Sequence, residues 1–373
     1  MAEVTAPPEP DAVDGAPHPR NTLSLIGQDA AQAEMLDAFT RGQMHHAWLL
    51  TGPRGVGKAT LAWTIARFLI AQPPPGGMFA GDPPTTLALP PDHPVTHRTR
   101  ALSDPDLLLL RRAYDEKADK LKTVITVDEV RRLNAFFALS SAEGGRRVVI
   151  VDSADDMNPQ AANALLKRLE EPPANATLLL ISHAPSRLLP TIRSRCRTLR
   201  LSPLLAADMA RALTAAGETP DDPVALAELA AGSVGEAVRL LRLGGLAIYG
   251  NLLRLLDTAP NMDRPALLTL AGTMTGAAKA DRFDMTLRLI DRLLARLARS
   301  GAGLPPLADI VRGESTILSR HSPDPWAARI WADVQQTLSA RAAHGRAVNL
   351  DPSALILDMG LTINQTAARI AAG

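Results

Sequence analysis

The sequence has one cysteine in 373 residues, and this scarcity excludes two kinds of structure. Cys196 alone cannot close an internal disulfide or build a cysteine-rich zinc site, so we expect the protein to contain no zinc. Aromatic residues are also rare, at 3% of the chain, whereas alanine and leucine are abundant, and this composition favours a mostly helical protein. No stretch approaches the roughly 18 consecutive apolar residues that cross a membrane, so we expect no membrane contact.

An excess of either charge is also missing, because 40 lysine and arginine residues balance 39 aspartate and glutamate residues. The formal net charge of +1 gives no overall attraction to nucleic acid, so any DNA contact would be local or shared with partners. Residues 1–20 are rich in proline and acidic residues, and they lack the basic and apolar regions of a secretory signal. We interpret them as a disordered tail on a cytoplasmic protein.

A glycine-rich stretch, GPRGVGKAT at residues 52–60, has the G-x-x-x-x-G-K spacing of a phosphate-binding loop. It lies between a short apolar segment, 46–50, and a segment with helical apolar spacing, 58–71. Strand, loop and helix form the context in which the motif works, because backbone N–H groups at a helix N-terminus surround the anion. The predicted, degenerate nucleotide site comprises Gly52, Gly55, Gly57, Lys58, Ala59 and Asp152.

Two positions in this site lack groups that ATP hydrolysis requires. Ala59 replaces the serine or threonine whose hydroxyl holds magnesium, and Thr60 cannot substitute because one helical step rotates the side chain by about 100°. Asp152 ends an apolar segment and could hold a metal, but Ser153 stands where an ATPase has a glutamate. The backbone and Lys58 could still bind ATP or ADP. The sequence therefore leaves nucleotide binding open and predicts no hydrolysis.

Strands and helices alternate through the first half of the chain. The predicted strands are 46–50, 146–155 and 176–183, and the predicted helices are 58–71, 127–139 and 158–173. This alternation predicts a parallel sheet with helices on both faces. A proline-rich segment, 72–94, is typical of a surface insertion, and the nearby His93 and His97 lack the companions of a metal site.

No strand pattern recurs after Pro203. Short helices are expected over 204–244, and longer amphipathic helices follow. Two apolar stripes with helical spacing are predicted to lie in the core: Phe283, Leu287, Ile290, Leu294 and Leu297, and Trp326, Ile330, Val334 and Leu338.

Three stretches together resemble the delta-prime family of bacterial DNA polymerase III clamp loaders: HAWLLTGPRGVGK, RRVVIVDSADDMNPQAANALLKRLEEPP and LLPTIRSRCRTLRLSPL. The most distinctive parts are NALLK-x-LEEPP and the triplet Ser194-Arg195-Cys196. The resemblance implies an α/β AAA+ ATPase-like domain with a parallel sheet at 21–203, a small helical lid at 204–244 and an all-α collar at 245–373. In this family the collar joins related subunits into a ring.

The resemblance also implies a catalytic role for Arg195. In the family this triplet supplies an arginine finger to the ATP site of a neighbouring motor subunit. A guanidinium suits this role because it stabilises charge on the transferred phosphoryl group. The alternative for Arg195 is a surface salt bridge, and Arg193 is either a helper or a solvated charge.

Departures from the motor subunits of the family indicate a stator that does not hydrolyse ATP. Gly235 stands where a motor subunit carries an arginine, and the segment 72–94 lacks the family's four-cysteine zinc module. The implied partners are the motor (tau/gamma) and delta subunits, with the sliding clamp and primer–template DNA engaged through the complex. The resemblance implies no required cofactor, and it assigns polymerase activity to the holoenzyme rather than to this chain.

Two other functions stay open at this point. The first is an active AAA+ ATPase, such as the motor subunit of the same complex, which would have to hold magnesium without a hydroxyl at position 59. The second is a small-molecule phosphotransferase, which would need an acceptor site and a base and leaves the triplet unexplained. ATP turnover by the isolated chain distinguishes the stator from the motor.

Overall fold

The computed structural model describes residues 8–372 except 74–82, 139–144, 275, 277–278 and 307. Part of the proline-rich segment 72–94 therefore lies outside the described residues. The chain divides into two compact units. The first comprises Met1–Glu218 with Gly232–Gly235, and the second comprises Thr219–Ala231 with Glu236–Gly373. The three-part division expected from the sequence, with a separate lid, stays a prediction.

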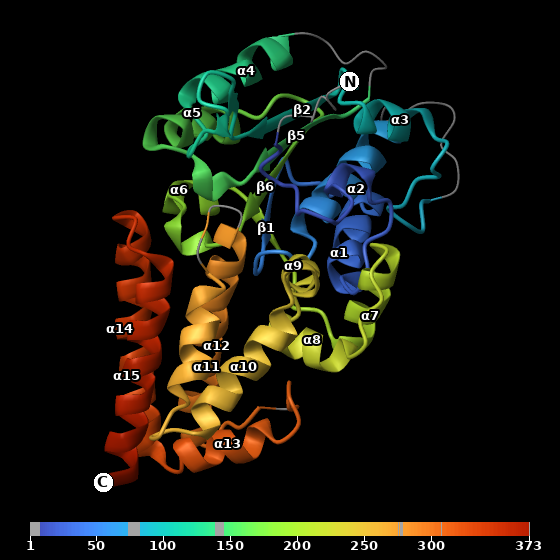
Figure 1. The fold of residues 1–373 in the computed structure, drawn as a ribbon. Coiled ribbons are helices and arrows are strands. Elements are labelled where there is room, and N and C mark those ends of the chain that lie inside the picture. The colour runs from blue at the N-terminus through green and yellow to red at the C-terminus, as the bar shows by residue number, and fades with distance from the viewer. Residues whose placement is uncertain are drawn as a thin grey trace, which may run out of the picture. The chain divides into compact units, whose positions relative to one another are not determined.

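Five parallel strands form the main sheet of the first unit (Figure 1). In spatial order they are β2 (Leu107–Arg111), β5 (Arg147–Asp152), β6 (Ala176–Ser182), β1 (Ala47–Thr51) and β7 (Arg197–Arg200). The predicted parallel sheet is confirmed, and it contains two strands, β2 and β7, that the sequence patterns did not indicate. Both are edge strands. The short β7, RTLR, is mostly polar, whereas β2, LLLLR, is a continuous apolar run that the sequence prediction did not assign to a strand.

Helices cover both faces of this sheet (Figure 1). On one face, α4 (Val127–Ala138), α5 (Pro159–Glu170) and α6 (Pro190–Arg193) pack on alternate strand residues such as Leu49 and Val149. Strand side chains alternate between faces, so Trp48 and Leu50 lie on the face that α2 (Lys58–Ala71) covers. The helices α1 (Asp29–Thr40) and α3 (Pro94–Arg100) complete this layer.

The remaining elements are short in the first unit and helical in the second. They are η1 (Pro19–Asn21), β3 (Tyr114–Asp115), β4 (Lys120–Leu121), η2 (Ala154–Asp156), η3 (Pro185–Arg187), α7 (Ala206–Ala215), α8 (Pro223–Ala230), α9 (Val234–Leu243), α10 (Gly245–Asp257), α11 (Arg264–Gly272), α12 (Ala280–Gly301), α13 (Glu314–His321), α14 (Pro325–Ala347) and α15 (Pro352–Ala372). No described helix has both the length and the apolar character needed to span a membrane.

The second unit has a helical core built on α12 and α14, which pack along each other. The predicted stripe from Phe283 to Leu297 on α12 is confirmed, because all five side chains are buried. The stripe on α14 needs one correction. Trp326 lies in the first helical turn and is 45% exposed, whereas Trp331 is fully buried and donates its indole N–H to the carbonyl of His321 at 2.8 Å.

A buried carboxylate, Glu314, accepts four hydrogen bonds from three residues inside the second unit. It accepts hydrogen bonds from the hydroxyl of Tyr249, from Arg296 Nε (2.7 Å) and Nη2 (3.1 Å), and from the backbone N–H of Ile310 (2.6 Å). Glu314 is fully buried and Arg296 is 7% exposed, so neither charge has water as an alternative partner. Each charge compensates the cost of burying the other. Removing either residue would therefore leave an uncompensated buried charge and destabilise the second unit.

Candidate functional site

The phosphate loop occupies residues 52–57, between the end of β1 and the start of α2. Gly52, Gly55 and Gly57 have positive φ angles of 145°, 76° and 101°. A Cβ atom at Gly52 would lie 2.5 Å from the carbonyl oxygen of Leu201, so a larger residue does not fit there. The structure therefore has the strand, loop and helix that the motif predicts, with glycine where the backbone requires it.

Lys58 is bound by its own loop. The side chain is almost completely buried, and its ammonium group donates hydrogen bonds to the carbonyls of Gly52 (2.7 Å) and Pro53. Burial lowers the pKa of Lys58 to about 8, although the negative charge of Asp152 opposes this shift. To reach a bound phosphate, the ammonium group would have to leave these two carbonyls.

The end of β5 places Asp152 and Ser153 at the same site. Burial raises the pKa of Asp152 to about 7, the negative charge of Asp11 adds to this shift, and the positive charge of Lys58 opposes it. The Ser153 hydroxyl is buried and has no hydrogen-bond partner among the described residues. Ala59 in the first turn of α2 offers only a methyl group. The site thus contains Lys58 and the carboxylate of Asp152, without an oxygen ligand at 59 or a carboxylate at 153.

The segment 232–235 packs directly on the phosphate loop within the first unit. The N–H of Gly235 donates a hydrogen bond to the carbonyl of Gly55 at 3.3 Å. A Cβ atom at Gly55 would lie 2.2 Å from the hydroxyl of Ser233. At the position where a motor subunit of the resembled family carries an arginine, this chain therefore brings backbone into contact with the loop.

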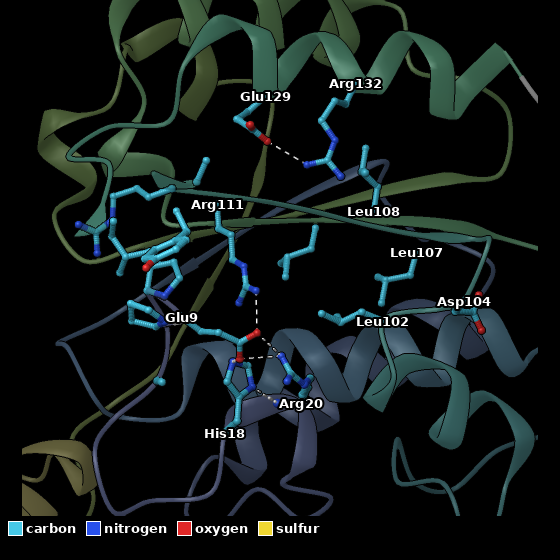
Figure 2. Close-up of a pocket in the computed structure, with 18 residues that line it drawn as sticks. Glu9, His18, Arg20, Leu102, Asp104, Leu107, Leu108, Arg111, Glu129 and Arg132 are labelled. Carbon is cyan, nitrogen blue, oxygen red and sulfur yellow. Dashed lines mark hydrogen bonds and ion pairs between the residues drawn. The ribbon is translucent and has the colours of Figure 1, made fainter. Parts of the chain in front are cut away.

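Sequence reasoning missed the contribution of residues 8–20, which lie in the segment interpreted as a disordered tail. Glu9 accepts hydrogen bonds from Arg20 at 2.6 Å and from Arg111 at 2.7 Å (Figure 2). The Asp11 side chain is 2% exposed, and its Oδ1 accepts a hydrogen bond from Arg111 at 2.9 Å and lies 3.2 Å from His18 Nε2. Local composition could not reveal these contacts, because Arg111 lies about a hundred residues further along the chain.

Glu9, Asp11 and His18 also offer a possible set of metal ligands, with one ligand atom of each within 4.8 Å of the others. Arg20 and Arg111 already neutralise the two carboxylates, so this cluster is balanced without a cation. The described residues therefore give no reason to place a metal at this cluster.

Arg195 follows α6, and its side chain is bound by Glu170 of the LEEPP motif. Its Nη2 lies 2.9 Å from Oε1 of Glu170, at the end of α5, and its Nη1 donates to the carbonyl of Thr191 at 3.0 Å. The side chains of Arg195 and Glu170 are 36% and 49% exposed, so this ion pair is open to solvent. Burial raises the pKa of the neighbouring Cys196 to about 12, which keeps that thiol neutral and unreactive.

Comparison with known proteins identifies relatives of this chain. Residues 27–205 match the family model described as DNA polymerase III, delta subunit. DNA polymerase III subunit delta' of Pseudomonas aeruginosa is 42% identical over 214 residues, which is 56% of this chain and 58% of the relative. Its counterpart from Escherichia coli is 32% identical over 213 residues, with the same two coverages. DNA polymerase III subunit gamma/tau of Mycobacterium tuberculosis is 31% identical over 210 residues, which is 55% of this chain and 33% of the relative.

Each of these matches is partial. The chain spans 58% of the length of the delta' relatives from P. aeruginosa and E. coli. The whole of the second unit lies outside the region matched by the family model, so that match says nothing about its role.

Proposed function

Because residues 27–205 match the family model described as DNA polymerase III, delta subunit, we propose that this chain is a delta'-type subunit of a clamp loader. It would assist ATP-driven loading of a sliding clamp onto primed DNA without hydrolysing ATP itself. The observation that carries this proposal is the combination of a well-formed phosphate loop with a methyl group at Ala59 and a hydroxyl at Ser153. The backbone is that of a phosphate-binding loop, but the site lacks a hydroxyl at position 59 to hold magnesium and a carboxylate at position 153 to position water.

Arg195 supplies the active contribution of the chain in this proposal. Its guanidinium would enter the ATP site of a neighbouring motor subunit and stabilise the charge on the transferred phosphoryl group. The resting ion pair with Glu170 suits this role, because an exposed ion pair contributes only about 0–1 kcal/mol and can exchange for a phosphate. Glu170 would thus hold the finger until a partner supplies a stronger anion.

The second unit is proposed to join the chain to its partners, the motor (tau/gamma) and delta subunits of a ring. The sliding clamp and primer–template DNA would be engaged through that complex, since the net charge of +1 gives this chain no general affinity for DNA. No cofactor is required by this role, and we propose that the complex acts in the cytoplasm.

A motor subunit is the second candidate, because the gamma/tau relative of M. tuberculosis is 31% identical over 210 residues. A motor would have to bind magnesium without an oxygen at Ala59 and position water without a carboxylate at Ser153. Both requirements conflict with the site as it stands.

The purified chain is expected to show no magnesium-dependent ATP hydrolysis above the background of the assay. The measurement is steady-state phosphate release with ATP and magnesium. Lys58→Ala provides the matched control, because it removes the ammonium group that the motif uses to bind phosphate and leaves the rest of the loop unchanged. If the wild-type chain turns over ATP and Lys58→Ala abolishes that turnover, the chain is a motor subunit and the proposal is wrong.

A further inference from the structure

The two edge strands of the main sheet differ in how they are protected against pairing with another strand. On β7, Arg197, Thr198 and Arg200 are exposed. On β2, four leucines precede the only charged residue, Arg111, which ends the strand, and there is no proline. Charged side chains and prolines on an edge strand hinder the addition of another strand. The edge formed by β2 lacks this protection along most of its length.

The backbone of β2 offers hydrogen-bonding groups on the side that faces away from β5. The N–H of Val148 on β5 donates to the carbonyl of Asp106 at 2.8 Å, so the backbone groups of Asp106 point toward β5. These groups alternate in direction along a strand, so those of Leu107 and Leu109 point the other way. The N–H of Leu107 donates to the carbonyl of Asp104. Among the described residues, the backbone of Leu109 has no partner on that side.

A cavity of about 690 Å³ lies along this edge of the sheet (Figure 2). Glu129 and Arg132 of α4 line it on one side of β2, and the segment that contains Glu9 and Pro10 lines it on the other. A second domain that offered its own sheet edge would bring helices about 10 Å thick into collision with these walls. A single extended chain has no such flanking layers, so it fits this recessed edge better than a second sheet does.

One side of the cavity is apolar. Leu107 and Leu109 are half-buried on β2, and Leu102, in the preceding loop, is 45% exposed. Side chains of a strand alternate between the two faces of a sheet. A strand added beside β2 would therefore place every second side chain on the side of these leucines, and apolar side chains at those positions would bury them.

The charges that line the cavity favour an acidic occupant. The lining contains four arginines: Arg20, Arg111, Arg112 and Arg132. It contains three carboxylates, of which Asp104 is 1% exposed and is bound by Arg98, so two accessible carboxylates are left. Asp11 and Asp156 also pair with two of the arginines, but from outside the lining. The surface of the cavity thus presents more guanidinium than carboxylate groups, which complements a peptide with acidic side chains.

We infer that the free edge of β2 binds an extended acidic peptide segment of another protein, which adds a sixth strand to the sheet. Its backbone bonds to Leu109 and the neighbouring residues, its apolar side chains cover Leu102 and Leu107, and its carboxylates meet the arginines. Main-chain bonds provide affinity in this mode of recognition, and alternate side chains provide specificity. The inference goes beyond the proposed function and is independent of it, because neither the phosphate loop nor Arg195 lines the cavity.

The test uses a synthetic peptide in which leucine or valine alternates with glutamate, acetyl-Leu-Glu-Val-Glu-Val-Glu-Leu-amide with a fluorescent label. Two further peptides carry N-methyl groups, one on the apolar residues and one on the glutamates. Alternate N–H groups of a strand point to opposite sides, so only one of these sets faces β2. Fluorescence anisotropy with the full chain should give a Kd below about 1 mM for the unmodified peptide. One methylated peptide should bind at least about tenfold more weakly, and the other about as well as the unmodified peptide.

Two pairs of protein variants locate the bound peptide. Leu109→Pro removes the N–H that points into the cavity, whereas Leu109→Ala, its control, shortens the side chain and keeps that donor. Arg132→Ala removes a lining arginine, and Arg131→Ala is its control because Arg131 forms the same kind of ion pair on α4 but does not line the cavity. Leu109→Pro should weaken binding more than Leu109→Ala does, and only the Arg132 variant of the second pair should weaken it. Thermal melting confirms that each variant is folded.

The inference is overturned if the unmodified peptide does not bind, or if the two methylated peptides lose affinity equally or not at all. It is also overturned if a folded Leu109→Pro chain binds the peptide as tightly as the wild type. Light scattering of the chain alone tests the other occupant. A dimer that Leu109→Pro abolishes and Leu109→Ala retains would show that a second copy, rather than a peptide, pairs with this edge.

Discussion

Arg195→Ala is expected to slow ATP hydrolysis by a reconstituted clamp loader without preventing its assembly. Arginine fingers contribute about 10³ to 10⁵ in rate at the site they enter. The loss measured for the whole complex is expected to be smaller, because in the proposed complex the finger would serve one ATP site among several. The measurement is the ATPase rate stimulated by DNA and clamp, with assembly checked by gel filtration. Arg195→Lys should recover little, because an ammonium group lacks the planar fork that binds two phosphate oxygens.

A second substitution separates a finger from a surface salt bridge. If the bond between Arg195 and Glu170 served only stability, Glu170→Gln and Arg195→Ala would have the same small effect. If Glu170 only holds the finger at rest, Glu170→Gln leaves the rate nearly unchanged, whereas Arg195→Ala lowers it. Arg187→Ala is the control for the loss of a nearby exposed arginine. A wild-type rate in the Arg195→Ala complex would show that this residue is a surface charge.

Glu314→Ala is expected to destabilise the second unit by about 3–5 kcal/mol, because it leaves the buried guanidinium of Arg296 without its partner. The hydroxyl of Tyr249 and the N–H of Ile310 lose their acceptor in the same step. Urea unfolding followed by circular dichroism measures this change in the free energy of unfolding. Tryptophan fluorescence gives an independent probe, because Trp331 is fully buried in this unit.

Asp358→Ala is the matched control for that experiment, because Asp358 forms an ion pair with Arg341 on the surface of the same unit. The two side chains are 43% and 48% exposed, so losing this pair should cost about 0–1 kcal/mol. Equal effects of Glu314→Ala and Asp358→Ala would contradict the role assigned to the buried network.

The sequence predicted the parts of the fold that have strong local patterns. The buried strands β1, β5 and β6 are continuous apolar runs, and α12 has a regular apolar stripe, so both kinds of element were visible in the sequence. Edge strand β7, RTLR, is short and mostly polar, and nothing in its composition marks it as a strand. On α14 the spacing favoured Trp326, but the buried residue is Trp331, because the packing of the helix against α12 decides which side is covered.

The candidate site likewise has parts that the sequence predicted and parts that it did not. Gly52 and Lys58 belong to a motif that can be read from consecutive residues, and the structure has the strand, loop and helix expected around them. The contacts of Glu9 with Arg111 and of Gly235 with Gly55 join residues far apart in sequence. A segment rich in proline and acidic residues was therefore interpreted as a tail, because Arg111, which binds Glu9 and Asp11, lies in β2 and far from them in sequence.

The central claim is that this chain acts as a non-hydrolysing member of a clamp loader, and reconstitution tests it most directly. The motor (gamma/tau) and delta subunits of the same organism are mixed with or without this chain. Loading of the cognate clamp onto primed circular DNA is then measured. We predict that the chain enters a stable complex and that its omission abolishes efficient loading. If the chain does not join the complex, or if loading is equally fast without it, the proposed function is contradicted.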